Sequence, residues 1–385
     1  MMLQRAFPLS FLALVSLAGC VAPGTEDGDV SFEVDGETTS NLSGGVHIET
    51  QSNADPAFGK RRILNRVVAM IEKTPNDGKI FAAIHSVDEA PVADALVAKA
   101  KKGATVKVVM NGATRGKDLP EKLRKGLAAS PRGAFEYCGQ PNGGDGCISN
   151  AKDGIMHSKL FLFSATEDEN GQARKSVSWM SSANMTTQTG ANTFNNAVAI
   201  YGDAKLHDAM KDRYFDHLFA KSSVPGTIVS GDSQTVVYAS PSADDLVADR
   251  LANIEAGAPC NVAISQNMIH FDTRPEIWKE VKRITTFCTV KVLVNHINRE
   301  SFDRLASAGI EAKYSYTHDK VFLIDAKLNG RPQRVAFTGS HNWTRDAQVS
   351  NDELLVRIAD PAAYQAMAAH LLRQWAAASK LAPGM

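Results

Sequence analysis

The chain of 385 residues contains an internal repeat, and this repeat limits the folds that the chain can adopt. Each half begins with two units in which a helix-like stretch precedes a short run rich in Val and Ile. These units span residues 61–112 in the first half and residues 242–296 in the second half. A hydrophobic period of 3.6 residues alternating with short apolar runs is typical of β-α-β units. The sequence therefore predicts an α/β fold: two similar α/β/α halves with mixed, largely parallel sheets, related by an approximate two-fold axis.

Polar pairs with identical spacing follow these units in both halves. His157 and Lys159 lead the apolar run "LFLF", and His318 and Lys320 lead the run "VFLI". Residues i and i+2 of an extended chain project from the same face, so each pair presents a titratable base beside a cation. The same spacing recurs further along the chain in Ser182 with Asn184, Ser340 with Asn342, and Asn351 with Glu353.

This doubled pattern resembles the phospholipase D superfamily, whose mark is HxKxxxxD followed by GSxN and NxE. The resemblance covers roughly residue 61 to the C-terminus. The second copy matches in full, with His318, Lys320, Asp325, Gly339, Ser340, Asn342, Asn351 and Glu353. The first copy is partial, with Ser164 in place of the Asp, Ser181 in place of the Gly, and Ala197 two residues after Asn195 in place of the Glu. The resemblance implies a pseudo-two-fold phospholipase D-like fold that works as a monomer, because single-copy relatives build the site as homodimers.

The shared residue types suit the hydrolysis of an anionic phosphodiester. The ammonium and amide groups would bind the non-bridging oxygens, and the two serines would add hydroxyl donors or orient those groups. A neutral imidazole would attack phosphorus to form a phosphohistidine, while a second, protonated imidazole would protonate the leaving alcohol. This chemistry needs no metal ion and no cofactor. The residues assigned to it are His157, Lys159, Ser182, Asn184, His318, Lys320, Ser340, Asn342 and Glu353.

The two histidines are expected to have different roles. We predict that Glu353 lies near His318, raises its pKa and makes it the general acid. His157, with Ala197 at the position of the first Glu, would stay neutral as the nucleophile. The opposite assignment remains open, because an orienting carboxylate also helps a nucleophile.

Several other polar residues are predicted to be structural. Asp325 lies five residues after Lys320, on the opposite face of an extended strand, so a structural role is more plausible than a catalytic one. His85, His270 and His296 close predicted strands, where lone histidines are more often satisfied structural residues than ligands.

The first twenty residues predict export and lipidation. Arg5 precedes an apolar run that is too short to span a bilayer and has the length of a secretory signal. The sequence "LAGC" at residues 17–20 resembles the bacterial lipobox, which implies lipidation of Cys20 and membrane anchoring through its acyl chains. Val21 carries no inner-membrane retention signal, so the outer membrane of a Gram-negative cell is favoured. The alternative is an ordinary cleaved signal peptide with an incidental Cys.

The remaining chain is predicted to contain three parts. Residues 21–59 are acidic and rich in Gly, Ser and Thr, which is typical of a flexible tether. The two phospholipase D-like halves are expected at residues 60–225 and 226–385. Export permits disulfides, and we favour the structural pairings Cys138–Cys147 and Cys260–Cys288 over a zinc site, because no CxxC spacing is present.

The net charge helps to rank the possible functions. Lys plus Arg and Asp plus Glu both number 42, so no global basic field favours nucleic acid as the partner. We therefore predict hydrolysis of phospholipid headgroups at a membrane. An endonuclease using the same site is the first alternative and would need a basic groove lined by aromatic residues. The second alternative is a surface-binding lipoprotein whose partial first copy has lost catalysis.

Overall fold

The computed structural model describes residues 45–51, 61–222, 226–229 and 234–381, which all belong to one compact unit. The predicted signal peptide, Cys20 and most of the predicted tether lie outside the described residues. Within the described ranges, no helix is long and apolar enough to cross a membrane.

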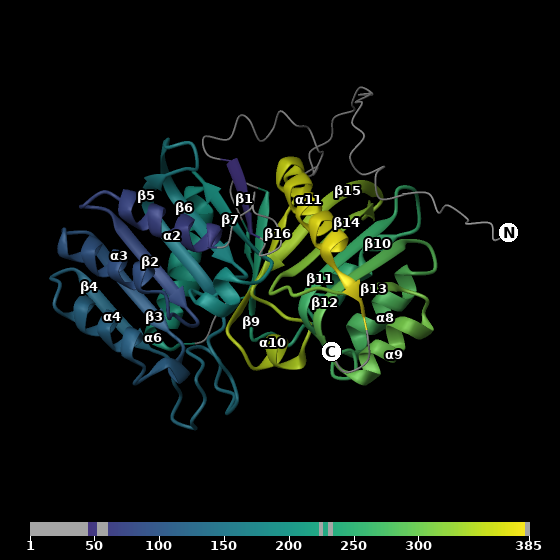
Figure 1. The fold of residues 1–385 in the computed structure, drawn as a ribbon, viewed down its shortest axis with the longest axis horizontal. Coiled ribbons are helices and arrows are strands. Elements are labelled where there is room, and N and C mark those ends of the chain that lie inside the picture. Colours follow the sequence, from purple (N-terminus) through teal and green to yellow (C-terminus); the bar gives the residue numbers. More distant parts are fainter. Residues whose placement is uncertain (1–44, 52–60, 223–225, 230–233, 382–385) are drawn as a thin grey trace. The chain divides into compact units, whose positions relative to one another are not determined.

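The first half contains a mixed sheet of seven strands in the order β1-β7-β6-β5-β2-β3-β4 (Figure 1). Parallel pairing joins β2 to β3 and β3 to β4, and the other neighbours pair antiparallel. The strands are β1 (Gly45–Gln51), β2 (Lys79–Ile84), β3 (Thr105–Met110), β4 (Gly133–Tyr137), β5 (Lys159–Glu167), β6 (Ala173–Ser181) and β7 (Asn195–Tyr201).

The second half repeats this arrangement in a ten-stranded sheet with the order β17-β13-β12-β11-β14-β15-β16-β9-β8, and β10 pairs with β14. The parallel pairs are again three consecutive strands, β11, β12 and β13. The strands are β8 (Ile228–Val229), β9 (Thr235–Ser240), β10 (Ile254–Glu255), β11 (Asn261–Ile269), β12 (Thr289–Ile297), β13 (Glu311–Tyr314), β14 (Lys320–Leu328), β15 (Arg331–Gly339), β16 (Glu353–Ile358) and β17 (Ser379–Lys380).

Helices on the outer faces bury apolar stripes against each sheet. In α2 the buried residues Ile63, Leu64, Val67, Met70 and Ile71 have the spacing of one helix face. The helices packed against the first sheet are α2 (Arg62–Lys73), α3 (Ala90–Lys101) and α4 (Asp118–Ala128), and those packed against the second are α7 (Ala248–Ala252), α8 (Pro275–Ile284) and α9 (Arg299–Ser307).

The two halves share a third apolar cluster, which joins strands of both sheets. Four helical segments contribute to it: α5 (Ala204–Met210), the π-helical turn η5 (Lys211–Phe215), α6 (Asp216–Ala220) and α11 (Pro361–Ala377). The remaining segments are η3 (Gly112–Thr114), η4 (Thr187–Ala191) and α10 (Arg345–Val349). Helix α11 begins after Asp360, whose side chain caps the helix, and crosses between the sheets in Figure 1. This architecture confirms the predicted duplicated α/β fold.

The prediction of a flexible tether at residues 21–59 is wrong for residues 45–51. These residues form β1, which pairs antiparallel with β7 along its whole length, from Gly45 opposite Tyr201 to Gln51 opposite Asn195. The Gln51 side chain also accepts a hydrogen bond from the backbone of Ile63 at 3.2 Å. Composition alone suggested disorder, but the unpaired edge of β7 provides backbone partners that an isolated segment lacks. The predicted helix over residues 242–257 is also shorter than expected, because only α7 and the short strand β10 form there.

Disulfides join Cys138 to Cys147 and Cys260 to Cys288, the two pairings that the sequence favours. The first closes a loop that follows β4, and the second joins residues that precede β11 and β12. Each therefore links segments that the fold already places together.

Candidate active site

The repeated His–Lys pairs lie at the starts of equivalent strands. Lys159 is the first residue of β5 and Lys320 is the first residue of β14, so His157 and His318 lie just before these strands. Each histidine is held by the opposite half of the chain. The backbone N–H of His157 donates to the carbonyl of Asp352 at 3.0 Å, and that of His318 donates to the carbonyl of Phe194 at 2.8 Å. These bonds bring both motif copies to one site.

The hydrogen bonds of the two imidazole rings determine which nitrogen carries the proton. Nδ1 of His157 lies 2.8 and 2.9 Å from the two carboxylate oxygens of Glu353. Nδ1 of His318 lies 2.9 Å from the carbonyl oxygen of Ser182. Because carboxylate and carbonyl oxygens only accept, each Nδ1 acts as the donor. In the neutral form of each ring, Nε2 therefore keeps its lone pair.

The structure contradicts the predicted position of Glu353. Its carboxylate pairs with His157 of the first half and not with His318 of the second. The reason is the packing of the halves, since the backbone bond between His157 and Asp352 brings the neighbouring Glu353 to the histidine from the other copy. The predicted increase in the pKa of His318 therefore loses its basis.

The alignment of the first NxE motif is also corrected by two residues. The N–H of Ser340 bonds to the carbonyl of Leu354 at 2.9 Å, and the N–H of Ser182 bonds to the carbonyl of Asn196 at 3.0 Å. These equivalent bonds place Asn195, rather than Ala197, at the position of Glu353. The Asn195 amide oxygen accepts a hydrogen bond from the Ser182 hydroxyl at 2.9 Å. An amide thus replaces the carboxylate in the first copy.

Both lysines are buried, and their ammonium groups bond to the carbonyl oxygens of His157 and His318, each at 2.5 Å. Burial lowers the pKa of Lys320 to about 7 and lowers that of Lys159 well below its usual value, although the Glu353 carboxylate opposes both shifts. Burial likewise raises the pKa of Glu353. An anion bound between the two lysines would oppose the lowering of their pKa values and favour their charged, ammonium forms.

Burial, reinforced by the two lysines, lowers the pKa of His157 and of His318 well below the usual value of a histidine. The two residues are only 8% and 6% exposed, respectively. Burial therefore disfavours the protonated form of both imidazoles in the ligand-free protein. An anion bound between the lysines would favour the charged form of either ring.

The motif asparagines and serines differ in how fully they are paired. The Asn184 amide nitrogen donates to the Thr189 hydroxyl at 2.8 Å. The Ser340 hydroxyl accepts from the N–H of Leu354 at 3.0 Å, and therefore fixes the strand register. Within the described part of the chain, the side-chain oxygens of Asn184 and Asn342 are buried without a partner. Buried amides without partners are unusual and mark positions where a ligand can bind.

The sequence interpretation missed His85 as a neighbour of the site and left open whether His341 lines the pocket. The ring of His85, predicted to be structural, lies edge-on to His157 with 4.7 Å between the ring centroids, and its Nδ1 donates to the carbonyl of Met156 at 2.9 Å. Burial, with a contribution from the Arg274 guanidinium, lowers the pKa of His341 to about 4. His85 follows the carboxyl end of β2, where ligands bind in α/β folds. This position in the sequence could have indicated that His85 lies near the site.

Asp325 lies outside the site, as its predicted structural role requires. It is the sixth residue of β14, and its carboxylate pairs with Arg334 of β15 at 3.4 Å. At the corresponding position of the first copy, the Ser164 hydroxyl accepts from the N–H of Lys79 at 2.8 Å.

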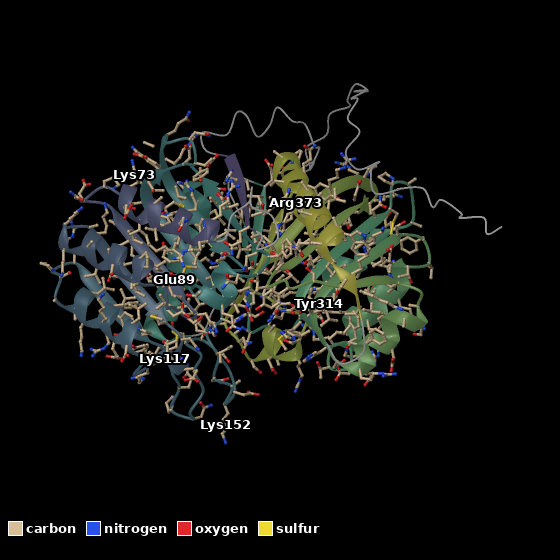
Figure 2. All side chains as sticks on the ribbon, in the orientation of Figure 1. Lys73, Glu89, Lys117, Lys152, Tyr314 and Arg373 are labelled. Carbon is tan, nitrogen blue, oxygen red and sulfur yellow. A yellow bond between two sulfur atoms is a disulfide. The ribbon has the colours of Figure 1, made fainter. Side chains whose placement is uncertain are left out.

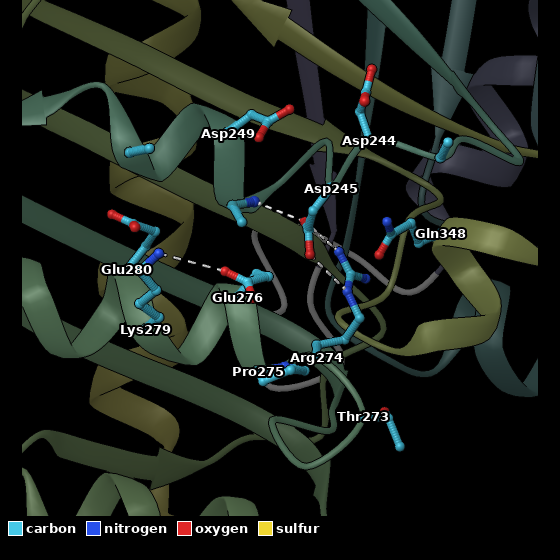
Figure 3. A pocket seen from close by; sticks show the side chains of 13 residues that line it. Asp244, Asp245, Asp249, Thr273, Arg274, Pro275, Glu276, Lys279, Glu280 and Gln348 are labelled. Atoms are coloured by element: carbon cyan, nitrogen blue, oxygen red, sulfur yellow. Dashed lines mark hydrogen bonds and ion pairs between the residues drawn. The ribbon is translucent and has the colours of Figure 1, made fainter.

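A separate acidic pocket lies beside α7 and α8 (Figure 3) and has a volume of about 540 Å³. No residue of the two motifs lines it. Arg274 connects it to the motif region, because its guanidinium pairs with Asp245 at 2.6 Å and donates to the carbonyl of Thr344 at 2.8 Å. The Asp245 carboxylate is thus paired with the Arg274 guanidinium within the pocket.

Comparison with known proteins is consistent with this geometry. The sequence matches a family model described as "Cardiolipin synthase, PLD-like domain" over residues 67–219 and 256–375. The fold is similar to that of a phosphatidylserine synthase from Haemophilus influenzae Rd KW20, with 13% identity, a TM-score of 0.59, and coverage of 90% of this chain and 91% of that one. It is also similar to a polyphosphate kinase from Porphyromonas gingivalis, with 14% identity, a TM-score of 0.55, and coverage of 86% of this chain. The chain spans only 50% of that kinase, and no curated protein matches the sequence.

Proposed function

The chain belongs to the phospholipase D-like family whose model is described as "Cardiolipin synthase, PLD-like domain", and from this premise we propose that it hydrolyses phospholipid headgroups through a phosphohistidine intermediate. Members of this superfamily are phosphodiester-processing enzymes. The choice of diester and the role of each residue are our proposals.

The observation that carries the proposal is the pairing of one buried carboxylate with only one of the two site histidines. Glu353 accepts from Nδ1 of His157, which leaves Nε2 free to attack phosphorus. The carboxylate also stabilises the positive charge that the ring gains when it becomes a phosphohistidine. Nδ1 of His318 lies beside the Ser182 carbonyl and the Lys320 ammonium rather than a carboxylate, so His318 suits a group that gives up a proton and takes it back.

The reaction then proceeds in two steps. Nε2 of His157 forms a bond to phosphorus while the bond to the headgroup oxygen breaks, and protonated His318 gives its Nε2 proton to that oxygen. Water next attacks phosphorus, His318 takes the proton of the water, and the phosphorus–nitrogen bond breaks. The negative charge of the bound diester raises the pKa of His318, so that the ring is protonated when it is needed.

The buried ammonium groups of Lys159 and Lys320 would neutralise the non-bridging oxygens throughout both steps. Asn184 and Asn342 would add amide donors, and Ser182 and Ser340 would hold the loops that carry them. In the ligand-free protein the lysine ammonium groups bond to backbone carbonyls and the Asn184 amide nitrogen bonds to Thr189, so these bonds would be exchanged for bonds to the phosphate when the diester binds.

A lipid substrate is supported by the balanced charge of the chain and by its N-terminal sequence. We propose that Cys20 is lipidated and anchors the protein in the cell envelope, in the outer membrane of a Gram-negative cell. Replacing Cys20 with Ser would then release the protein from the membrane fraction. Retention of the Cys20→Ser protein in that fraction would contradict the anchor.

The activity is tested with the purified full-length protein and vesicles of mixed phospholipids, in the presence of excess chelator. We expect headgroup release that is lost in His157→Ala. His217→Ala is the matched control, because the His217 ring bonds to the Ser222 hydroxyl at 2.9 Å and has no motif role. No release from any lipid would reject the proposal. DNA cleavage by the same samples would then favour the endonuclease, and vesicle binding without any cleavage would favour the surface-binding lipoprotein.

A further inference from the structure

The first half contains a loop that the second half lacks. Residues 138–156, which we call the disulfide loop, separate β4 from His157, whereas only residues 315–317 separate β13 from His318. The disulfide between Cys138 and Cys147 closes part of this loop. Lys152, labelled in Figure 2, lies on its exposed portion. The insertion therefore directly precedes only one of the two site histidines in the chain.

The disulfide loop is bound to a single carboxylate of the other half. One oxygen of Asp352 accepts from the N–H of Cys147 at 2.6 Å and of Ile148 at 3.2 Å, and the other accepts from the N–H of Ser149 at 2.7 Å. Asp352 has no solvent exposure. A buried carboxylate that accepts three backbone N–H bonds is a strong and specific anchor, because charge-assisted bonds are about twice as strong as neutral ones.

The backbone of Asp352 holds the catalytic histidine. Its carbonyl accepts from the N–H of His157 at 3.0 Å and from the Ser158 hydroxyl at 2.9 Å, and its own N–H donates to the carbonyl of Ile155 at 2.9 Å. The next residue is Glu353, whose carboxylate orients the His157 ring. One residue thus connects the disulfide loop, the histidine and the carboxylate.

The opposite copy has no equivalent anchor. Phe194 occupies the position of Asp352, because its carbonyl accepts from the N–H of His318 in the same way. Its side chain is apolar and cannot hold a loop through hydrogen bonds. The packing around the disulfide loop is also close, since a side chain at Gly154 would collide with the carbonyl oxygen of Ser350. The second half therefore restrains the disulfide loop directly beside His157.

We propose that Asp352 is a positioning residue and that, with the Cys138–Cys147 disulfide, it holds Glu353 against Nδ1 of His157, so that opening this disulfide slows the reaction. The rate effect rests on the proposed function, whereas the positioning itself does not. Closing the loop covalently limits its conformations, and three amides then reach Asp352 without a large loss of entropy. When the disulfide is reduced, the loop moves more freely and Asp352 loses part of its anchor.

The test compares three variants of the full-length protein. Asp352→Asn keeps the size of the side chain but removes its charge, and the pair Cys138→Ser with Cys147→Ser opens the loop. The pair Cys260→Ser with Cys288→Ser is the matched control, because it removes a disulfide just before β11 and β12 whose residues supply none of the three amides bound to the Asp352 carboxylate. We measure kcat and KM for diester hydrolysis, and we use ¹⁵N NMR to follow the Nδ1–H signal of the His157 ring.

In Asp352→Asn and in the loop-opening pair, we expect kcat to fall about tenfold with little change in KM, which corresponds to the loss of one charged hydrogen bond. The Nδ1–H signal should weaken in the same two variants. The control pair should keep its kcat and its NMR signal, even if its melting temperature falls. Unchanged kcat and an unchanged signal after opening the loop would overturn the proposal, and so would an equal loss in the control.

Two further results keep the test decisive. If the native protein cleaves no diester, the proposed function fails, and the NMR comparison alone decides whether Asp352 positions the pair. If a variant does not fold, the native protein is titrated with dithiothreitol, and thiol labelling with mass spectrometry reports which disulfide has opened. The His157 signal should then weaken as Cys138 and Cys147 become labelled, and an unchanged signal would refute the proposal.

Discussion

The change from Glu353 to Gln tests the proposed role of the carboxylate most directly. Gln has nearly the same size as Glu, so the packing of the fully buried site should survive. Gln still offers an oxygen to Nδ1 of His157 but carries no charge. The variant therefore isolates the contribution of the negative charge to the reaction at His157.

The expected magnitude follows from the contact. Both carboxylate oxygens lie within 2.9 Å of Nδ1, and the pair is shielded from solvent. A hydrogen bond to a charged group contributes about 1.5–3 kcal/mol. Gln keeps a neutral hydrogen bond of about 0.5–1.5 kcal/mol, so the charge alone contributes about 1–1.5 kcal/mol. Because about 1.4 kcal/mol corresponds to a factor of ten, kcat should fall roughly 5- to 10-fold. KM should change little, since Glu353 does not contact the phosphate in the proposed reaction.

The assay is headgroup release under steady-state conditions, together with acid quenching to measure the phosphohistidine. Asp325→Asn is the matched control, because it removes a buried carboxylate that pairs with Arg334 away from the site. This control should keep its kcat. A kcat of Glu353→Gln within about twofold of the native value would refute the reasoning, because the difference of about 1 kcal/mol between a charged and a neutral hydrogen bond exceeds that factor.

Three other predictions follow from the site. His318→Ala should lose the cleavage of alkyl diesters but should still react with a p-nitrophenyl diester, because the p-nitrophenolate leaving group needs no proton. With this substrate the variant should accumulate phosphohistidine. Equal losses of activity on both substrates would exclude His318 as the general acid. The kcat/KM ratio should fall as pH rises through about 7, because burial lowers the pKa of Lys320 to about 7 and the lysine loses its charge above that pH. In Lys320→Arg this fall should move to higher pH. An unmoved profile would assign the fall to another group. Lys320→Met should be inactive yet more stable to urea, by at most about 5 kcal/mol. A lysine whose pKa is lowered by folding reduces the free energy of unfolding at pH values below its folded pKa. The stability gained in Lys320→Met should therefore be full below pH 7 and should vanish above pH 10.5. An unchanged stability at pH 6 would contradict a cost of burying the Lys320 charge.

Much of the candidate site could be predicted from local patterns. A strand places residues i and i+2 on one face, so the spacing of His157 with Lys159 and of His318 with Lys320 already indicated paired side chains. Repetition in both halves made the pattern specific. The duplicated α/β fold could be predicted for the same reason, because hydrophobic periodicity reflects burial within each helix and strand.

The first NxE motif shows where pattern matching failed. We aligned Asn195 with Asn351 because the residue types agree, which placed Ala197 at the position of the Glu. The hydrogen bonds between strands show that Asn195 corresponds to Glu353. A signal was available, because Ser182 and Asn195 are thirteen residues apart, as are Ser340 and Glu353. Strand register depends on such distances, and a match of residue types alone does not determine it.

By itself, the sequence determined most of the helices and strands of the two halves, that they form twice, and which side chains are candidates for the chemistry. Each of these follows from interactions between residues close together in the chain. Only the tertiary structure decided that the Glu353 carboxylate pairs with the His157 ring and that Asp352 binds the disulfide loop. These bonds join residues from opposite halves, separated by about 200 positions, and they form because both carboxylates are buried where no water can replace their partners. Local periodicity carries no information about such contacts, because they depend on how the two halves pack.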